Sequence, residues 1–483
     1  SDTDTEVVVK LVDYYYKKYN LGPVDALAKT MVRVRGSYAL CVMFKDYPGE
    51  IWAARKESPM IIGVADGETY VASDVPAILK YTCNLEMARL TPGEVHFYNL
   101  DGEEIEKELT EIKWDAEAAE KGGYEHFMMK EIHEQPRAAL DTLNSVVKNG
   151  NIDLSEIHLT DEEIRSISQI QFVACGSAYH VGVAAQYVIE DLARIPVRVE
   201  LASEFRYRRP ILDPNALVVV ISQSGETADT LAALRLAKEK GVRTLAIVNV
   251  VGSSIAREAD NVFYTLAGPE IAVATTKAYS TQLIACYALA VQFALVREEI
   301  SKEQYAGYIQ EMMSLPEKMK RVLEDKERIQ WFAAKYANAK DAYLIGRGID
   351  YAICLEGSLK MKEISYIHSE AYAAGELKHG TISLIEDGTL VIGVLTQEEL
   401  YEKTLSNLVE VKSRGAYLMG LTTYGNYEIE DTVNFTVYTP KTDPHFSTSL
   451  AIIPLQLLGY YLSVARGLDV DKPRNLAKSV TVE

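Results

Sequence analysis

The order of apolar and polar positions divides the chain into two parts with different patterns. Residues 1–115 begin with amphipathic helix patterns and continue with short strand-like runs separated by turns, which predicts a small α+β domain. A polar connector, 116–144, follows, and its helix pattern His126–Glu134 should end before Pro136. The helices expected in the first part are Val7–Tyr19 and Val24–Val34, and the expected strands are Tyr38–Phe44, Ile51–Ala54, Met60–Val64, Thr69–Ala72 and Gly93–Tyr98.

Beyond the connector, apolar strands alternate with helices, which is typical of βαβ units. This part of the chain repeats itself. Gly176 and Gly348 follow equivalent strands and are 348 − 176 = 172 residues apart, and Glu204 and Glu376 have the same separation, 376 − 204 = 172. The repeat predicts an α/β fold of two tandem doubly wound parallel-sheet domains, at 145–300 and 301–467, followed by a tail, 468–483.

The stretch ALVVVISQSGETADT, 216–230, is the strongest candidate for ligand binding. Its apolar half predicts a strand buried on both faces, and Glu226–Lys240 predicts a helix. The turn between them would direct backbone N–H groups, the positive end of a helix dipole and the hydroxyls of Ser222, Ser224 and Thr227 at one spot. We interpret this turn as a phosphate site. The alternative is that Ser224 simply caps the helix.

Other parts of the sequence limit what this site can be. The chain contains neither a Walker motif nor a G-x-G-x-x-G fingerprint, and the second repeat has Leu395–Glu398 in place of the hydroxyl-rich turn. One ligand site in the first repeat is therefore expected. The turns Cys175–Ser177 and Val273–Lys277 should meet it at the carboxyl ends of the strands, although a threonine N-cap would also explain the second of these turns.

The composition excludes several classes of partner. Acidic residues exceed basic ones by 69 − 50 = 19, which argues against binding to nucleic acid or to an anionic membrane. The five cysteines are scattered, and no His or Cys falls in a metal-ligand spacing, so neither a disulfide framework, a metal nor a cofactor is expected. No signal-peptide pattern is present, and the longest apolar stretch, Leu283–Val296, is too short to cross a bilayer. A soluble cytoplasmic protein is the expectation.

Three longer strings make a family resemblance specific: ASEFRYR at 202–208, LKMKEISYIHSEAYAAGELKH at 359–379, and PRNLAKSVTVE at 473–483. Together with the glycine turn and SQSGETADT, they resemble the paired sugar-isomerase domains of glutamine–fructose-6-phosphate aminotransferases, and the similarity extends over the whole chain. The resemblance implies that fructose 6-phosphate is converted to glucosamine 6-phosphate with glutamine or ammonia as nitrogen donor, in a homodimer. It also implies two sets of substrate contacts: Ser177, Ser222, Gln223, Ser224 and Thr227 around the phosphate, and Val273 and Thr275 at the sugar.

The same resemblance implies the catalytic residues. Lys478 matches the lysine that forms an imine with the sugar, although its position alone suggests a solvated tail residue. Glu363 matches the base that moves the C1/C2 proton, with a surface ion pair to Lys360 as the alternative. Lys360 matches a lysine that assists at the sugar oxygens. His379 matches the ring-opening acid or base, which the neighbouring subunit supplies, and its alternative is a helix C-terminal histidine.

The beginning of the chain departs from the family pattern. Family members start with an N-terminal-nucleophile glutaminase domain whose first residue is a cysteine, whereas residue 1 here is Ser1. Residues 1–115 resemble only the later part of that domain, in which Asp4 matches an aspartate that contacts the glutamine amino group. Cys41 lies in the strand pattern Tyr38–Phe44, is expected in the core, and is therefore not a substitute nucleophile. Glutamine hydrolysis is therefore expected to be lost in this polypeptide.

Two rival functions use the same architecture. A non-catalytic sugar-phosphate sensor would keep the phosphate turn but would not need Lys478, Glu363 and His379 together. A simple sugar-phosphate isomerase would not need the glutaminase-like residues 1–115. The sequence favours the aminotransferase over both.

Overall fold

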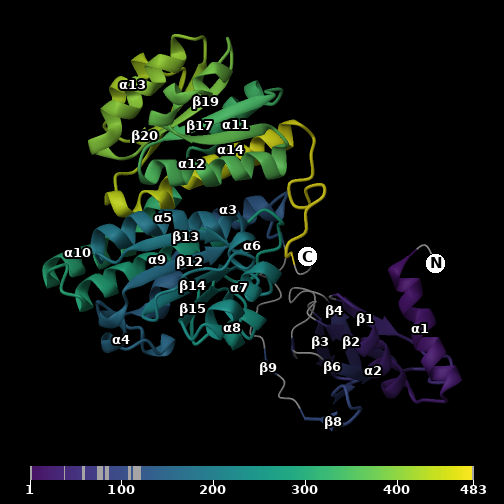
Figure 1. Cartoon of the computed structure of the whole chain (residues 1–483). Coiled ribbons are helices and arrows are strands. Elements are labelled where there is room, and N and C mark those ends of the chain that lie inside the picture. Colours follow the sequence, from purple (N-terminus) through teal and green to yellow (C-terminus); the bar gives the residue numbers. More distant parts are fainter. Residues whose placement is uncertain are drawn as a thin grey trace. The chain divides into compact units, whose positions relative to one another are not determined.

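The computed structural model describes residues 3–36, 38–56, 60–72, 80–81, 86–106, 110–111 and 121–480. The chain forms two compact units, one made of Ser1–Ala119 with Val480–Glu483 and the other of Glu120–Ser479 (Figure 1). Each unit is described by itself below.

The smaller unit is an α+β unit, as the sequence pattern predicts, but the expectation that Cys41 lies in its core was wrong, because Cys41 is exposed. Two helices contribute Val12, Leu27 and Met31 to an apolar cluster that also contains Trp52 of the main sheet. That sheet is antiparallel, with strand order β1-β2-β6-β7-β8. Its elements are α1 (Asp4–Lys18), α2 (Pro23–Arg33), β1 (Tyr38–Val42), β2 (Ile51–Lys56), β6 (Glu86–Thr91), β7 (Glu94–Tyr98) and β8 (Glu104–Ile105), and beside them lie the strand pairs β3 (Ile61–Ala65) with β4 (Glu68–Ala72) and β5 (Lys80–Tyr81) with β9 (Thr110–Glu111).

The sequence pattern missed one strand of that sheet, β6. Its apolar residues do not alternate cleanly, since Met87, Ala88 and Leu90 are all buried. Arg89 lies between Ala88 and Leu90, whereas Met87 and Ala88 are adjacent, so the alternation of apolar and polar residues typical of a strand is not visible in the sequence. Pairing with both β2 and β7 defines this strand, and no local signal reports such pairing.

The helix expected at His126–Glu134 is α3, and it continues to Val146. The prediction that Pro136 would end it was wrong. A proline cannot donate to the carbonyl four residues earlier, here that of Ile132. The side-chain amide of Gln135 donates to this carbonyl instead, at 3.0 Å, and so satisfies the acceptor that the proline leaves open.

The larger unit contains the two predicted parallel sheets, and the repeat is confirmed by their identical strand order. The first sheet runs β13-β12-β14-β15-β16 and the second β18-β17-β19-β20-β21. Their first strands begin at Gln169 and Asp341, and 341 − 169 = 172 residues separate them. The strands are β12 (Gln169–Ala174), β13 (Val197–Leu201), β14 (Ala216–Ser222), β15 (Arg243–Val248) and β16 (Asn261–Tyr264), then β17 (Asp341–Gly346), β18 (His368–Ala373), β19 (Leu390–Leu395), β20 (Tyr417–Thr423) and β21 (Phe435–Thr439).

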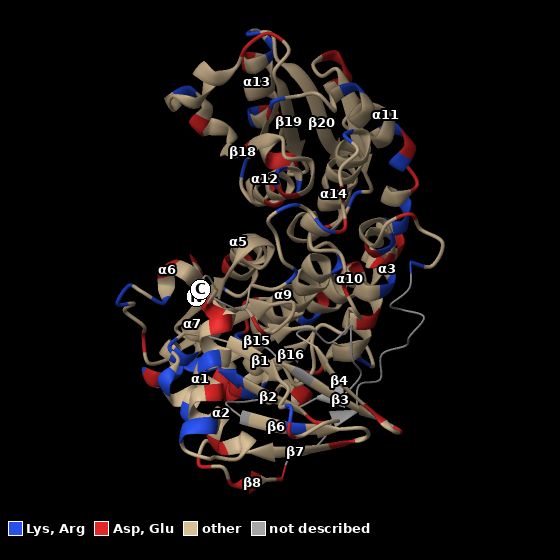
Figure 2. Ribbon diagram, turned by 90° about the vertical axis from the view of Figure 1, so that its right-hand side faces the viewer, with Lys and Arg blue, Asp and Glu red and all other residues tan. Residues whose placement is uncertain are grey.

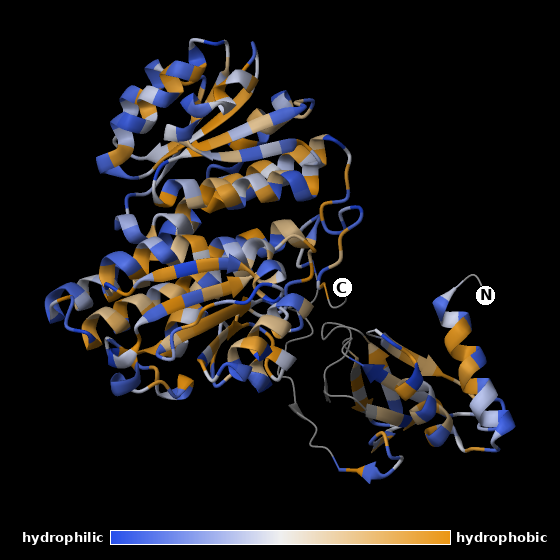
Figure 3. Cartoon of the chain, viewed as in Figure 1, coloured by the Kyte–Doolittle hydropathy of each residue, from blue (hydrophilic) through white to orange (hydrophobic). Residues whose placement is uncertain are grey.

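Helices cover both faces of each sheet in the larger unit (Figure 1). Apolar positions gather on the strands and on the helices between the sheets, whereas outer helices carry many polar positions (Figure 3). Basic and acidic segments are interspersed on outer helices (Figure 2). The longer helices are α5 (Gly176–Leu192), α7 (Ala228–Glu239), α9 (Lys277–Val296), α10 (Lys302–Leu323), α11 (Lys326–Tyr336), α12 (Ile349–Lys360), α13 (Tyr401–Lys412) and α14 (Thr448–Ala465).

Two helices of the larger unit are long and apolar enough to cross a membrane, Lys277–Val296 and Pro444–Ala465. The expectation that the apolar stretch Leu283–Val296, which lies in α9, is too short to cross a bilayer was wrong. In both helices, however, 89% of the apolar window is buried inside the protein. A helix that is apolar on all sides is also what the core of a large α/β unit requires, and α9 and α14 occupy equivalent places in the two copies.

Candidate active site

The expected phosphate turn joins β14 to α7 and is held together by its own polar groups. Ser222 Oγ lies 2.9 Å from Thr227 Oγ1 and accepts the N–H of Gly225 at 3.0 Å. Gly225 has φ +68°, and a Cβ there would lie 2.0 Å from Ser253 Oγ, so only glycine fits. Helix α7 begins at Ala228 with Thr227 as its N-cap, and the alternative in which Ser224 caps the helix is therefore wrong.

This turn lies at the topological switch point of the first sheet. Strand β12 pairs with β13 on one side and with β14 on the other, so the direction in which strands are added reverses between β12 and β14. The turn that starts α5, Cys175–Ser177, and the turn 222–227 follow these two neighbouring parallel strands. Ligands of open α/β sheets bind at such a point.

Helix α12 of the second copy brings a buried cation to the start of α5. Lys360 Nζ donates to Ser177 Oγ at 3.0 Å and lies 2.5 Å from Glu363 Oε2 and 3.3 Å from Glu356 Oε1. His180 Nδ1 of α5 lies 2.8 Å from the other oxygen of Glu356. The side chains of Lys360 and Glu356 are fully buried, and that of Glu363 is 19% exposed. The alternative reading of Lys360 and Glu363 as a surface ion pair was therefore wrong.

The charges in this cluster act on one another strongly because the cluster is buried. Burial raises the pKa of Glu363, and the negative charge of Glu356 adds to this shift against the opposing effect of Lys360. Burial also acts against the charged form of Lys360, but the carboxylates of Glu356 and Glu363 outweigh it and raise the pKa of the lysine. A carboxylate with a raised pKa beside a fixed cation suits general acid–base work near neutral pH.

Glu363 lies in a one-turn π-helix, Met361–Ser365, that directly follows α12. Such turns are rare and often occur at functional sites. The next residue, Tyr366, has a left-handed backbone (φ +58°), and its hydroxyl accepts the N–H of Arg474 at 2.8 Å. The Arg474 guanidinium also lies over the Tyr366 ring, 4.1 Å from its centre. The segment that carries Glu363 is thus fastened to the C-terminal tail.

The tail itself is anchored along the first copy. Asp471 accepts the N–H groups of Phe127 and Met128 at the start of α3, each at 2.9 Å, and its carbonyl accepts the N–H of Val273 at 3.0 Å. At the end of the tail, Ser479 Oγ lies 3.0 Å from Ser224 Oγ of the phosphate turn. These contacts hold the tail next to the phosphate turn.

Lys478 is therefore not a solvated tail residue, which was the alternative for it. Its side chain is 14% exposed, and Nζ donates to Glu270 Oε2 and to the Ala272 carbonyl, each at 2.7 Å. Its charge also acts on Glu363, although burial has the largest effect on that carboxyl. The tail that carries Lys478 is thus bonded to the phosphate turn through Ser479 and to the segment that carries Glu363 through Arg474.

The loop before α9 holds the remaining sugar-contact candidates, Val273 and Thr275, which are half-buried. Helix α9 begins at Lys277 with Thr276 as its N-cap, but the Thr276 side chain makes no capping bond. Glu270 Oε1 caps the helix instead, because it accepts the N–H groups of Thr276 and Ala278 at 2.9 and 3.1 Å. The simple threonine cap considered for this turn was wrong.

Of the remaining candidates, His379 makes no contact with this cluster within the described residues, and Asp4 belongs to the other compact unit. His379 is exposed at the end of a 3-10 helix, Ala374–His379, before Gly380. Asp4 is the first residue of α1 in the other unit, where its carboxylate accepts the N–H of Thr5 at 2.6 Å. Gln223 belongs to the phosphate turn and is half-buried, and its carbonyl accepts the N–H of Asn249.

Sequence reasoning missed Glu270, Glu356 and His180. Glu356 precedes Lys360 by one helical turn on α12, and this i,i+4 spacing was the available signal. His180 and Glu270 had no local signal, since their partners lie 176 and 208 residues away in the sequence.

No group of three or more His, Cys, Asp and Glu side chains within the described residues is arranged to hold a metal ion. The polar groups at the site are hydroxyls, backbone N–H groups, carboxylates and lysines. These groups suit an anionic sugar with a carbonyl carbon, on which a lysine and a carboxylate can act.

Comparison with known proteins agrees with this geometry. The SIS domain family matches residues 163–292 and 335–466, which cover the two sheets. A glutamine–fructose-6-phosphate aminotransferase (isomerizing) of Caldanaerobacter subterraneus subsp. tengcongensis is 56% identical over all of this chain, and one of Clostridium acetobutylicum is 54% identical. The chain spans 80% of the length of each of these relatives. The solved C-terminal domain of glucosamine-fructose-6-phosphate aminotransferase from Francisella tularensis, 38% identical, superposes with a TM-score of 0.70 over 73% of this chain and all of that one.

The fold thus defines a class, the proteins with paired SIS domains, and the predicted phosphate turn lies in the first domain. The sequence identity with these relatives over the full chain identifies one family within this class. The protein belongs to the family of glutamine–fructose-6-phosphate aminotransferases.

Proposed function

We propose that this protein converts fructose 6-phosphate to glucosamine 6-phosphate, by amino-group transfer and ketose-to-aldose isomerisation. The carrying observation is that the tail with the lysine is bonded both to a hydroxyl-lined phosphate turn and to the segment that carries a carboxylate of raised pKa. The names of the full-length relatives support the substrate, and they support glutamine as nitrogen donor, with free ammonia as the other candidate.

Each group has a role in this reaction. Ser222, Gln223, Ser224 and Thr227 bind the phosphate with backbone N–H groups of the turn, and Ser177 binds beside them. Val273 and Thr275 contact the sugar. The loop that bears them is held by the tail, which supports this assignment.

The chemistry follows from the remaining groups. Lys478 attacks C2 of the open-chain sugar and forms an imine. Glu363 then moves the proton between C1 and C2, and Lys360 donates to the sugar oxygens while it holds the Glu363 carboxylate in place. Lys360 is already bound to Ser177 next to the phosphate turn, which supports this role.

Ring opening also needs an acid or base, and in this cluster Glu363 is assigned to a later step while His180 is paired with Glu356. We assign it to His379 of a second copy of the chain, because His379 is exposed and without a hydrogen bond or ion pair to any described residue. The protein then acts as a homodimer, and we place it in the cytoplasm with other enzymes of sugar-phosphate metabolism. The loss of glutamine hydrolysis stays a prediction.

The test is to incubate the protein with fructose 6-phosphate and either ammonium or glutamine, and to identify the sugar products. Glucosamine 6-phosphate is expected with ammonium. Glucose 6-phosphate alone would support a simple isomerase, and tight binding of fructose 6-phosphate without any turnover would support the sensor. Either of the last two results contradicts the proposed function.

A further inference from the structure

The carboxylate that holds Lys478 has surroundings that set it apart from an ordinary ion-pair partner. Glu270 is fully buried, and its two oxygens accept bonds from two backbone N–H groups of α9 and from Lys478 Nζ. Burial acts against its charge, but Lys478 and these N–H groups outweigh that effect and lower the pKa of Glu270. Glu270 is therefore a fixed anion, 2.7 Å from the atom that is to react.

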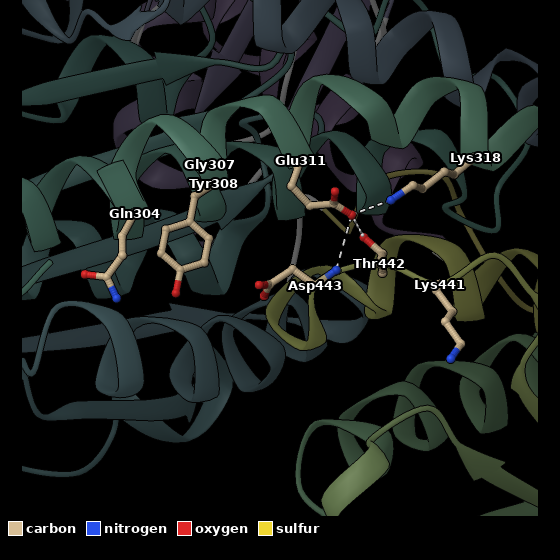
Figure 4. A pocket seen from close by; sticks show the side chains of 8 residues that line it. All are labelled: Gln304, Gly307, Tyr308, Glu311, Lys318, Lys441, Thr442 and Asp443. Carbon is tan, nitrogen blue, oxygen red and sulfur yellow. Dashed lines mark hydrogen bonds and ion pairs between the residues drawn. The ribbon is translucent and has the colours of Figure 1, made fainter. Parts of the chain in front are cut away.

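A comparison of the two copies of the fold shows which contacts in this region belong to the repeated structure and which occur only in the first copy. In the first copy, Glu131 of α3 accepts the N–H groups of Ile271 and Ala272. In the second copy, Glu311 of α10 accepts the N–H of Asp443 at 3.2 Å and the hydroxyl of Thr442 at 2.6 Å (Figure 4). A glutamate on the helix before each sheet thus holds the loop that leads into the last helix of that copy.

The sequence also shows that Glu131 and Glu311 are equivalent. Glu131 precedes Pro136 by five residues, and Glu311 precedes Pro316 by five, and both prolines lie inside their helices. The glutamate that binds the loop is therefore part of the repeated fold.

The two copies differ, however, in the residue that directly precedes the loop N–H group bound by this glutamate. It is Glu270 in the first copy and Thr442 in the second. The first copy has the tail against its loop, through Asp471 and Lys478. In the second copy, a hollow of about 520 Å³ borders Lys441, Thr442 and α10 (Figure 4). The buried carboxylate at position 270 thus occurs only in the copy that has the reactive lysine, which indicates a role in the reaction in addition to its capping of α9.

We propose that Glu270 is a catalytic residue that shuttles a proton of Lys478 during imine formation and then serves as the counter-ion of the iminium. This inference rests on the proposed function. The Lys478 ammonium gives one proton to the Glu270 carboxylate, and the free amine forms a bond to C2 of the open-chain sugar. The C2 oxygen takes up one proton from the nitrogen that has bonded to C2 and the second from Glu270, and it leaves as water when the C2–O bond breaks. An ammonium and a ketone become an iminium and water, so both protons and charge balance.

The neighbouring charges leave Glu270 and Lys478 as the pair that can exchange a proton. Glu131 faces Glu270, and burial together with the charge of Glu270 raises the pKa of Glu131 to about 8. Glu131 is then mainly neutral at pH 7, which leaves Glu270 and Lys478 as the balanced pair. Two other nearby charges are involved: Lys277, which pairs with Glu134 at 2.6 Å, also acts on Glu131, and the charge of Lys478 acts on Glu363. The lowered pKa of Glu270 acts against this transfer, but the transfer turns a buried anion and cation into a neutral acid and a neutral amine and so creates no net charge in the buried site.

The experiment compares Glu270→Asp with Glu270→Asn, which have nearly the same shape and differ in the carboxylate. Each variant is mixed with fructose 6-phosphate and sodium borohydride, and the rate of the reduced adduct at Lys478 is followed by peptide mass spectrometry from pH 6 to 9. Borohydride reduces iminium ions, so the rate at which the adduct forms reports the addition of the amine to C2 and the loss of water together. We expect the Asn variant to form the adduct about 100-fold more slowly than the Asp variant at pH 7, with equal affinity for fructose 6-phosphate.

Glu311→Gln is the control, because it changes only the glutamate that holds the equivalent loop in the second copy. This variant should form the adduct at the rate of the unmodified protein. Equal adduct rates in the Asp and Asn variants would overturn the role of Glu270. Absence of any adduct in the unmodified protein would instead refute the proposed function, so the two failures are distinguishable. A thermal unfolding curve for each variant shows that the pair is compared in the folded state.

Discussion

Replacing Lys478 with alanine is expected to abolish formation of glucosamine 6-phosphate while fructose 6-phosphate still binds. The lysine is the only group proposed to bond to the sugar, and its loss removes the imine through which the later steps proceed. The loss in kcat should be about 10³-fold or more, or about 4 kcal/mol in activation free energy. The phosphate turn does not depend on this side chain, so the dissociation constant for the sugar should change by no more than about threefold.

Product formation with ammonium and calorimetric binding of fructose 6-phosphate measure the two effects separately. Lys472→Ala is the matched control, because Lys472 belongs to the same tail and is exposed. It should behave as the unmodified protein does. A Lys478→Ala variant that keeps a tenth or more of the activity would show that the tail lysine is not the nucleophile.

Glu363→Gln is expected to block the reaction after imine formation. The amide cannot accept the C1 proton, so kcat should fall about 10²–10⁴-fold. The borohydride adduct at Lys478 should still form, because Glu363 acts only after the imine exists. Glu399→Gln, an exposed glutamate of the second copy, is the control.

The pH profile gives a second measure of the same role. Burial raises the pKa of Glu363, and a base works only when it is deprotonated. Activity of the unmodified protein should therefore fall on the acid side at a pH above the usual range for a glutamate, as the carboxylate takes up a proton. An acid limb at the ordinary glutamate pKa, or a Glu363→Gln variant that keeps full activity, would exclude Glu363 as the base.

The features that could be predicted from the sequence are those with a local cause. The phosphate turn is a short stretch whose hydroxyls and glycine are adjacent in the chain, and Ser222 and Thr227 indeed contact each other. The repeat was visible because equivalent glycines recur at a constant separation, and both sheets have the expected strands.

The features that could not be predicted depend on distant parts of the chain. Lys360 is buried because α12 packs against the start of α5, and its partner Ser177 lies 183 residues away. The alternatives for Lys360, Glu363 and Lys478 were all surface positions, since burial of a charge has no local signature. Pro136 misled the prediction for a similar reason, because the Gln135 side chain replaces the missing backbone donor. The family resemblance pointed to Lys478, but the contact with Glu270 appears only in the fold.

The central claim is that the tail lysine reacts with the sugar held by the phosphate turn. The most direct measurement is to treat the protein with fructose 6-phosphate and sodium borohydride and to locate the modified residue by peptide mass spectrometry. We predict a single reduced sugar-phosphate adduct, on Lys478, that disappears when excess inorganic phosphate competes for the turn. An adduct on another lysine, or none while glucosamine 6-phosphate is formed, would contradict the account.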